Sequence, residues 1–336
     1  MDTLTWLSLG LQLGALCSIV GALLLYLLRK VRVAEVAPAD SAKTVLVTSV
    51  DTALGLQIAT YLSGRGWRVI GGCRAGGLGA RLAESWLAAQ AGSPNDPPPR
   101  LATLELDVTR EDMLEEAARA TAQHLPAGEH GIWAVINTAG SSARGGAAGW
   151  DAALRANVLA ALRVARTFSP LLAAAAAEHA HAGRLFYIGL TSDTACERSS
   201  AQPDADEGLA CAAAARWGVW GAARALRGSL RARRVHVALL HAPDLPTEAL
   251  YAPPAQLSVP AASRPDTPSS DVTTSTASCA VNMPGEAAEY SAKVIPTSAL
   301  KILEDALTSP SPRDSYYLKI KQDSWFTRMP SLRVSP

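Results

Sequence analysis

The residues whose types and spacing best suit ligand chemistry form an eight-residue run, Thr48-Ser49-Val50-Asp51-Thr52-Ala53-Leu54-Gly55. A β-branched stretch typical of a buried strand leads into the run, and a helical pattern follows over residues 54–63. When a helix follows a strand and a turn of small residues, the N–H groups at its start can face a pyrophosphate. The run is therefore a candidate dinucleotide-binding turn, although Gly55 is the only glycine left of the three that such turns have.

Composition argues against other kinds of site. The formal net charge is +1, and the sequence has no basic tract. Since binding to a phosphate backbone depends on a local excess of Lys and Arg, we expect no nucleic-acid partner. The five cysteines form no CxxC pair, and the six histidines form no HExxH motif. We therefore predict no metal site and no disulfide framework.

The elements around the turn alternate regularly between strand and helix. Strand patterns occur at residues 44–48, from 67 onward, and at 101–106, 132–136, 184–188 and 235–240, and helical patterns at 54–63, 111–123, 152–177 and 212–232. Such alternation requires crossover connections between parallel strands. We predict an α/β fold with a doubly wound parallel sheet covered by helices on both faces.

Further motifs follow the turn in order: Asp107-Val108, Asn137-Thr138-Ala139-Gly140, Arg155-Ala156-Asn157-Val158, Gly183-Arg184-Leu185-Phe186 and Ala306-Leu307-Thr308-Ser309. At these spacings the chain resembles the short-chain dehydrogenase/reductase superfamily, within it the membrane-linked retinol and hydroxysteroid dehydrogenase branch. The resemblance runs from about residue 43 to 317. It implies a Rossmann-type fold with a site for NAD(P).

The resemblance also implies which residues line the cofactor: Thr48, Ser49, Ala53, Gly55, Arg74, Asp107, Val108, Asn137, Ala139 and Gly140. Asp107 is placed against the adenine. Ser49 and Ala53 replace the first two glycines of the turn, and the methyl group of Ala53 would crowd the ligand, so we expect weak cofactor binding. Arg74 stands where an acidic residue would hold a ribose hydroxyl. It slightly favours NADP, unless it is an ordinary surface arginine.

The catalytic positions of the family depart further from the pattern. The family uses a Ser, a Tyr, a Lys four residues after the Tyr, and an upstream Asn. The Tyr exchanges a proton with the substrate, and the Lys lowers the pKa of the Tyr and holds the ribose. Asn157 is retained, whereas Leu190, Ala212 and Arg216 occupy the Ser, Tyr and Lys positions. Because a methyl group has no proton to transfer, we expect the usual hydride transfer to be impaired.

Few neighbouring residues offer a replacement. A local shift would bring the hydroxyl of Thr191 or Ser192 to the Ser position. No tyrosine is an evident substitute, because Tyr187 lies on the preceding predicted strand. The pairs Tyr26/Lys30 and Tyr317/Lys321 match the family's Tyr–Lys motif by spacing alone.

The two ends of the chain differ from the predicted domain. Residues 4–28 are apolar and uncharged, and a helix of this length crosses a hydrocarbon core of roughly 30 Å. A cleaved signal peptide is the alternative, but the basic residues follow the segment. The positive-inside rule then predicts a single-pass anchor, expected in the endoplasmic reticulum membrane, with the domain facing the cytosol. We divide the chain into an anchor at 1–28, a linker at 29–42, a domain at 43–252, a Ser/Thr/Pro-rich loop at 253–290 and a C-terminal helix and tail at 291–336.

Three functions are consistent with these residues. The first is a catalytically impaired relative of the dehydrogenases that binds a dinucleotide or an apolar, lipid-like molecule, alone or as a dimer with itself or a related dehydrogenase. The second is an active NAD(P)-dependent oxidoreductase on retinoid- or steroid-type alcohols or ketones. The third is a non-enzymatic membrane scaffold. The substitutions at Ala212 and Arg216 favour the first over the second, and the retained Asp107, Asn137 and Asn157 favour it over the third.

Overall fold

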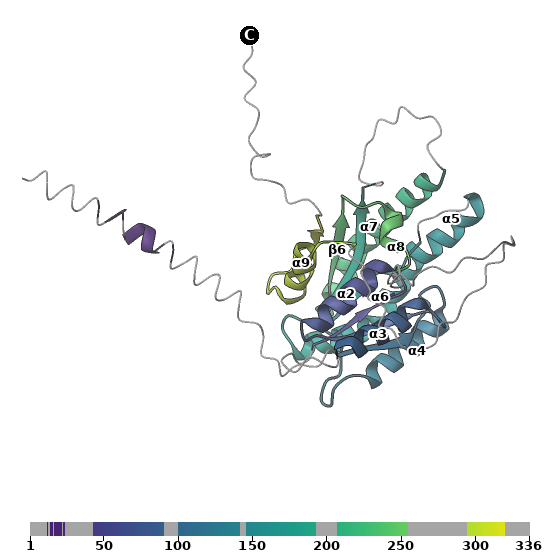
Figure 1. Cartoon of the computed structure of the whole chain (residues 1–336), viewed down its shortest axis with the longest axis horizontal. Coiled ribbons are helices and arrows are strands. Elements are labelled where there is room, and N and C mark those ends of the chain that lie inside the picture. Colours follow the sequence, from purple (N-terminus) through teal and green to yellow (C-terminus); the bar gives the residue numbers. More distant parts are fainter. Residues whose placement is uncertain are drawn as a thin grey trace, which may run out of the picture. The chain divides into compact units, whose positions relative to one another are not determined.

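The computed structural model describes residues 43–90, 100–141, 146–192, 207–254 and 294–319, together with part of 12–23 (Figure 1). The described residues within 12–23 are helical, and Ile19, Val20 and Leu23 are exposed. Most of the predicted anchor, the linker, nearly all of the predicted 253–290 loop and the end of the tail lie outside the described residues, as do Tyr26, Lys30 and Lys321.

The sheet has seven strands: β1 (Thr44–Val47), β2 (Arg68–Cys73), β3 (Arg100–Glu105), β4 (Ala134–Asn137), β5 (Arg184–Thr191), β6 (His236–Ala242) and β7 (Ser315–Tyr317). Their order is β3-β2-β1-β4-β5-β6-β7, and every neighbouring pair is parallel. All four residues of β1 and of β4 are buried, as expected of central strands with both faces covered. The predicted doubly wound parallel sheet is confirmed.

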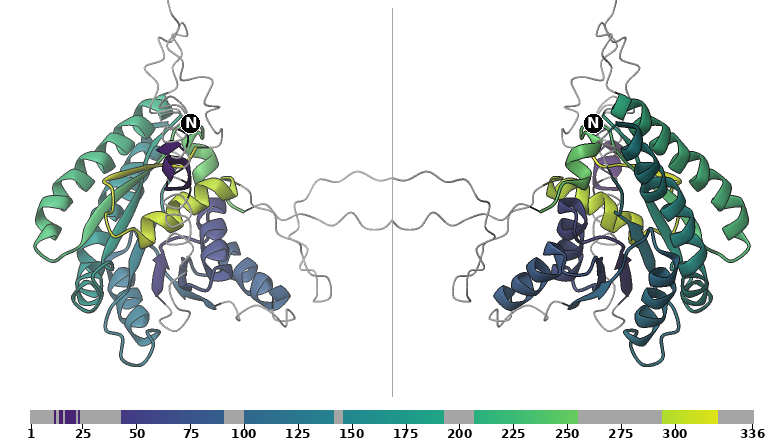
Figure 2. Two further views of the ribbon diagram at one scale, coloured as in Figure 1. Left: turned by 90° about the vertical axis from the view of Figure 1, so that its left-hand side faces the viewer. Right: turned by 90° about the vertical axis from the view of Figure 1, so that its right-hand side faces the viewer.

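Helices cover both faces of the sheet (Figure 2). Their bounds are α2 (Ala53–Gly64), α3 (Leu78–Gln90), α4 (Glu111–Gln123), α5 (Gly146–Leu154), α6 (Ala160–Glu178), α7 (Glu207–Arg231), α8 (Thr247–Tyr251) and α9 (Thr297–Thr308). One core packs α2, α3 and α9 against the sheet, and a second core packs α4, α6 and α7 against the opposite face. Period-3.6 patterning had indicated most of these helices, because each buries one apolar stripe.

The long helix expected at residues 152–177 is interrupted in register. A π-helical stretch, η1 (Arg155–Leu159), joins α5 to α6. A π-turn adds a residue to one helical turn and is common at functional sites. Here it carries Asn157, which is buried.

The C-terminal part belongs to the same sheet and core. The motif at Arg184 contacts the motif at the end of α9, because the buried Arg184 guanidinium donates to the carbonyl oxygens of Ala306 and Ser309. The Trp133 indole donates to the carbonyl of Leu307 at 2.7 Å. After α9 the chain adds β7 beside β6. The sequence patterns had indicated α9 but not β7, α8 or α3.

Among the described residues, one helical stretch is long and apolar enough to span a membrane. It runs from Gly149 to Glu178 and contains η1 and α6. Val164, Phe168 and Leu172 from this stretch are buried in the core against the sheet. Its apolar character is therefore explained by packing within the domain.

Candidate functional site

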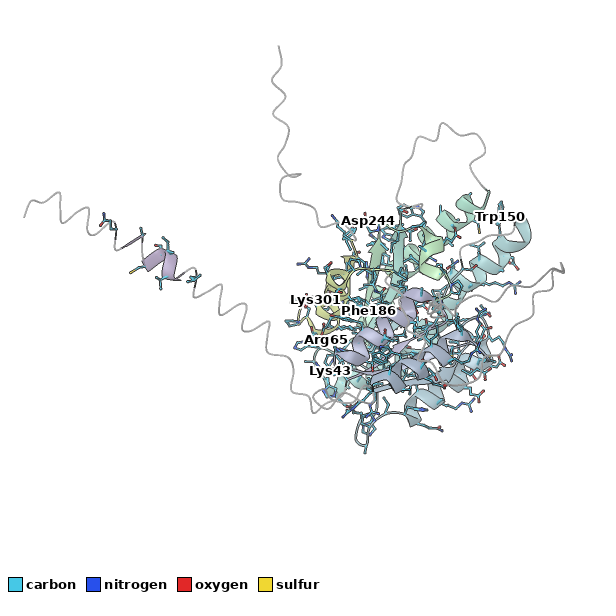
Figure 3. The ribbon with its side chains drawn as sticks, in the orientation of Figure 1. Lys43, Arg65, Trp150, Phe186, Asp244 and Lys301 are labelled. Atoms are coloured by element: carbon cyan, nitrogen blue, oxygen red, sulfur yellow. The ribbon has the colours of Figure 1, made fainter. Side chains whose placement is uncertain are left out.

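A cavity of about 490 Å³ opens at the carboxyl ends of the central strands. Ligands of open α/β sheets bind at this edge. Figure 3 labels Trp150 on α5 and Asp244 after β6 at this end of the domain, with Lys43, just before β1, at the other end. The cavity is lined by Thr48, Ser49, Asp51, Thr52, Arg74, Leu106, Asp107, Val108, Thr109, Ala139, Gly140, Ser141, Ala152, Ala156, Tyr251 and Pro253.

Thr48 connects the ends of β1 and β4. Its hydroxyl donates to the Asn137 side-chain oxygen at 2.8 Å and accepts the N–H groups of Thr138 and Ala139 at 3.1 and 3.2 Å. Asn137 and Ala139 are buried. These three predicted cofactor residues therefore form one buried brace beneath the cavity, with Thr48 and Ala139 reaching its wall.

Gly55 lies where the turn meets the helix behind it. A Cβ added there would lie 1.7 Å from the Ser49 carbonyl oxygen. The Thr138 hydroxyl donates to that same oxygen at 2.9 Å and accepts the Ser49 N–H at 3.1 Å. The remaining glycine of the turn is therefore required for close packing of α2 on the turn.

The N-terminus of α2 already has partners for some of its N–H groups. The Thr52 hydroxyl caps the helix by accepting the Gly55 N–H at 3.1 Å. The Ala53 N–H donates to the Ala252 carbonyl oxygen at 2.8 Å, and the Ala53 side chain is buried. Ala53 was predicted to face the cofactor with its methyl group. In the structure this methyl group is packed inward, and Ala53 does not line the cavity.

Asp51 is a cavity residue that sequence reasoning missed. Its carboxylate accepts the backbone N–H of Arg74 at 2.7 Å and of Gly79 at 3.2 Å. Arg74 Nε lies 3.9 Å from the same carboxylate, while the Arg74 side chain is 73% exposed. Asp51 thus brings an acidic group from the turn to the end of β2, where the sequence alone showed only Cys73-Arg74. The only sequence feature that could have identified Asp51 as a cavity residue was its position in the turn after the first strand.

A smaller cavity of about 230 Å³ lies beside Arg74. Arg74, Arg81 and Glu105 supply its charged lining. Cys73 also lines it, and burial raises the pKa of the Cys73 thiol to about 11. This thiol is therefore protonated near neutral pH and is a poor nucleophile.

Asp107 and Val108 line the main cavity after β3, as predicted. One Asp107 carboxylate oxygen accepts both the N–H and the hydroxyl of Thr109, at 2.9 and 2.7 Å. Gly140 forms the opposite part of the lining. The cavity thus brings together seven of the predicted cofactor residues: Thr48, Ser49, Arg74, Asp107, Val108, Ala139 and Gly140. Asn137 supports the site from below, and Gly55 packs behind it.

Asn157 and Arg216 are hydrogen-bonded to each other inside the domain. Arg216 Nη2 donates to Asn157 Oδ1 at 2.5 Å, and Nη1 donates to the Ile188 carbonyl at 3.2 Å. Asn157 Nδ2 donates to the carbonyls of Ser141 and Ala153 at 2.8 and 2.9 Å. Both side chains are buried, and neither lines the cavity. The retained Asn157 therefore serves as a brace for η1 and for Arg216.

Ala212, which was predicted to stand at the family's Tyr position, is packed in the interior. Ala212 is 4% exposed and forms a small cluster with Ala153, Cys211 and Trp150. At the Ser position, the Leu190 N–H donates to His241 Nδ1 at 3.0 Å. Neither position presents a hydroxyl to the cleft.

The hydroxyls considered as replacements lie elsewhere. Thr191 is fully buried, with its hydroxyl 2.8 Å from that of Thr247. The Tyr187 hydroxyl donates to the Ala161 carbonyl at 2.8 Å, and burial raises the pKa of Tyr187. Tyr317 stacks on His241 with the ring centroids 5.0 Å apart. None of the three lines the cavity.

Tyr251 is the tyrosine that the structure brings to the site. It ends α8, lines the cavity, and has the Arg216 guanidinium carbon 5.0 Å from its ring centroid. No local motif links the two residues, which are far apart in the sequence. Sequence reasoning named no tyrosine as a substitute and did not consider Tyr251, which approaches from α8 and not from the helix that was predicted to carry the family's Tyr position.

The comparisons with known proteins agree with this geometry. Residues 43–252 match the short chain dehydrogenase family. A stretch of 173 residues is 30% identical to 17-beta-hydroxysteroid dehydrogenase type 6 of Bos taurus, covering 50% of this chain and 48% of that protein. A stretch of 152 residues is 31% identical to retinol dehydrogenase 16 of Mus musculus, covering 44% of each chain. The chain thus spans about half the length of the curated relatives it matches.

Among solved structures, an NADH-dependent reductase A1-R′ complexed with NAD aligns with a TM-score of 0.48 at 18% identity, over 61% of this chain and 80% of that chain. The assignment depends on the family match, which covers well over half of the sequence. The chain belongs to the short-chain dehydrogenase family.

Proposed function

We propose that this protein is a membrane-anchored short-chain dehydrogenase relative that keeps a weak nucleotide site and does not perform the family's usual hydride transfer. The observation that carries the proposal is Ala212, a buried methyl group packed against Ala153 and Trp150 where the family has its proton-donating tyrosine. Loss of a positioned general acid typically lowers rates by about 10²–10⁴. The loss is larger when the acid works as part of a unit.

The Lys position gives further support. A lysine there would offer a compact ammonium group to the cofactor and to the tyrosine. The Arg216 guanidinium is instead engaged by Asn157 and the Ile188 carbonyl, and it is 1% exposed. Arginine is bulkier than lysine and does not deprotonate, so it does not replace the lysine. The polar groups of this region are therefore used for structure.

The cavity residues fit the adenosine side of NAD(P). Asp107 keeps one carboxylate oxygen beyond the one that accepts from Thr109, and a carboxylate can accept from an adenine amino group. Arg74 is mostly exposed beside a smaller cavity that Arg81 also lines, which suits a 2′-phosphate. The Asp51 carboxylate opposes that phosphate. We therefore expect weak binding with a slight preference for NADP.

Nucleotide binding without turnover is the direct test. Purified full-length protein should be stabilised by NADPH in a thermal-shift assay and should alter NADPH fluorescence, without oxidising NADPH when retinal or a steroid ketone is added. Turnover at ordinary enzymatic rates, about 1–10³ s⁻¹, would contradict the proposal. If NADPH gives no stabilisation and no turnover is seen, the result would favour a scaffold whose cleft has no ligand.

The cofactor preference has its own pair of variants. Arg74→Ala should weaken NADP binding more than NAD binding, because only NADP carries the 2′-phosphate. Arg100→Ala, an exposed arginine on the neighbouring strand β3, is the matched control and should change neither. Equal losses of NAD and NADP affinity in Arg74→Ala would show that the arginine does not contact the phosphate.

A second candidate function is an active NAD(P)-dependent oxidoreductase on retinoid- or steroid-type alcohols or ketones. The proximity of Tyr251 to Arg216 favours it, because a tyrosine beside a cation is the pair of groups that the family uses for proton exchange. In that case Tyr251→Phe would abolish turnover, whereas under the first proposal there is no turnover to lose. Steady-state assays of both proteins distinguish the two functions.

We also propose that residues 4–28 anchor the protein in the endoplasmic reticulum membrane, with the domain in the cytosol. The support is the uncharged length of this segment and the basic residues that follow it. Alkaline carbonate should leave the full-length protein in the membrane pellet and release a variant lacking residues 2–28. Protease added to intact microsomes should digest the domain, and protection of the domain would reverse the orientation.

We propose that the protein forms a dimer through an exposed apolar surface on its helices. Leu154, Leu159, Leu162 and Trp217 are exposed large apolar side chains on α5, η1, α6 and α7. Leu162→Glu should shift a dimer toward monomer in sedimentation-velocity experiments, with a second copy or a related dehydrogenase as the partner.

An apolar, lipid-like ligand also remains part of the proposal, and fluorescent retinoid binding would test it.

A further inference from the structure

The substituted catalytic positions and the cavity are separated in this protein. The described residues that form the wall of the 490 Å³ cavity do not include Asn157, Leu190, Ala212 or Arg216. The lining comes from the turn after β1, the end of β2, the segments after β3 and β4, Ala152 and Ala156 on α5 and η1, and Tyr251 and Pro253 at the end of α8. The family resemblance assigns the residues at the strand ends to the adenosine diphosphate half of the cofactor. It assigns the Lys position, here Arg216, to the ribose of the nicotinamide half.

Tyr251 contacts both regions, because it lines the cavity and lies beside Arg216. A Cβ added to Gly140 would lie 2.4 Å from Tyr251 Cζ and 2.5 Å from Asn157 Oδ1. The aromatic ring therefore packs directly on the glycine that the cofactor was expected to contact. Arg216 lies 5.0 Å from the centroid of the same ring. A group that reached Arg216 by way of Gly140 would have to displace this ring.

The backbone after Tyr251 is held at the start of α2. The Ala252 carbonyl accepts the Ala53 N–H at 2.8 Å, and Pro253 follows on the cavity wall. One of the N–H groups at this helix start is therefore already paired with the segment that carries Tyr251. Ala53, which was predicted to stand where the family has a glycine, is buried and does not line the cavity.

We infer that the site takes an adenine mononucleotide or the adenosine diphosphate half of a larger nucleotide, because Tyr251 and Ala252 close the end where a nicotinamide riboside would lie. The inference rests on the proposed nucleotide site and narrows its ligand class. A dinucleotide binds through its adenosine diphosphate half, and the nicotinamide half adds no affinity. This closure and the substitution at Ala212 together explain why this member of the family would not perform the family's hydride transfer.

Calorimetric titration of the full-length protein with two matched pairs of ligands tests the inference: ADP against NAD, and 2′,5′-ADP against NADP. In the unmodified protein the Kd values within each pair should agree within about threefold. Tyr251→Ala should make the dinucleotide bind at least fivefold more tightly than its mononucleotide. Tyr251→Phe, which keeps the ring, should behave like the unmodified protein.

The outcomes separate the inference from the proposed function. If the unmodified protein binds NAD or NADP at least tenfold more tightly than the matching mononucleotide, the inference is overturned while the nucleotide site stands. Equal affinities that remain equal in Tyr251→Ala would show that Tyr251 is not the barrier. If no adenine nucleotide binds to any of the three proteins, the nucleotide site and the inference both fall. Should Tyr251→Ala fail to fold, the comparison within the unmodified protein still decides.

Discussion

The Arg216 guanidinium donates to the Asn157 side-chain oxygen at 2.5 Å inside the domain, with both residues at positions where the family has catalytic groups. The bond joins α7 to the π-helical stretch that interrupts the long helix before β5. Asn157 also holds the backbone of Ser141 and Ala153. Residues placed for catalysis in relatives thus act here as an internal support.

Asn157→Ala should lower the free energy of unfolding by about 3 kcal/mol, because it leaves an arginine N–H and several backbone groups without partners. The same substitution made in an Arg216→Met background should cost less, since the charged donor is no longer there to be left unpaired. Urea unfolding of the four proteins in this cycle measures the difference. Equal costs in the two backgrounds would mean that the two side chains are not coupled.

Restoring the missing tyrosine should damage packing. Ala212→Tyr places a large ring in a site that Ala153 and Trp150 fill, and overpacking of this kind costs about 1–3 kcal/mol. Ala214→Tyr, at an exposed position of the same helix, is the control and should change stability by less than about 0.5 kcal/mol. Thermal denaturation of both variants checks the prediction, which fails if they have the same Tm.

Gly55→Ala should destabilise the turn by about 2 kcal/mol, because its Cβ would lie 1.7 Å from the Ser49 carbonyl oxygen. Gly64→Ala is a matched control at the other end of α2. Its Cβ would meet only Trp86 at 3.9 Å, so this change should be neutral or stabilising. Chemical denaturation of the two variants should give shifts of different size, and similar midpoints would mean that α2 can move away from the turn.

Arg184→Met should detach the end of α9 from the sheet. The buried guanidinium donates to the carbonyls of Ala306 and Ser309, and loss of such charge-assisted bonds should cost about 3 kcal/mol. Arg65→Met removes an ion pair between a half-exposed arginine and Glu304 on the same helix and should cost less than about 1 kcal/mol. Hydrogen exchange of α9 should accelerate in the first variant only. Unchanged protection in Arg184→Met would assign the docking of α9 to its apolar face.

His241 should make the domain less stable in mild acid. Burial, together with the charge of Arg227, lowers the pKa of His241 below its ordinary value of 6.5, and Nδ1 must stay unprotonated to accept the Leu190 N–H. Below about pH 6.5 the unfolded chain therefore binds a proton at this site that the folded chain does not bind. The free energy of unfolding should fall as the pH decreases from 6.5 toward the lowered pKa.

The measurement is the urea midpoint at pH 7.5 and at pH 5.5, made on the unmodified protein and on His241→Asn. Asparagine keeps a side-chain acceptor near the Leu190 N–H and does not titrate. The drop between the two pH values should be smaller in the variant. An equal drop in both proteins would assign the acid sensitivity to other groups.

The sequence by itself determined the order of most strands and helices, although not α3, α8 or β7, since each apolar pattern is contained in one short stretch of chain. The strand at residues 44–48 and the helix at 111–123 correspond to β1 and α4 because their apolar residues recur at the period of a single element. The motifs at Thr48, Asp107 and Gly140 also predicted a nucleotide cleft, and these three residues line one cavity in the structure. The prediction that the Ser–Tyr–Lys set is absent likewise comes from the sequence, because it depends on the alignment of Leu190, Ala212 and Arg216 with the family's motif.

Only the tertiary structure decided what those positions do. Asp51 reaches the end of β2, and Tyr251 packs on Gly140, through contacts between residues far apart in the chain. No periodicity or local motif records such a contact, because it depends on how the loops after different strands meet at one edge. The sequence therefore predicts which chemical groups are missing, and the structure shows that Tyr251 lies beside the buried Arg216.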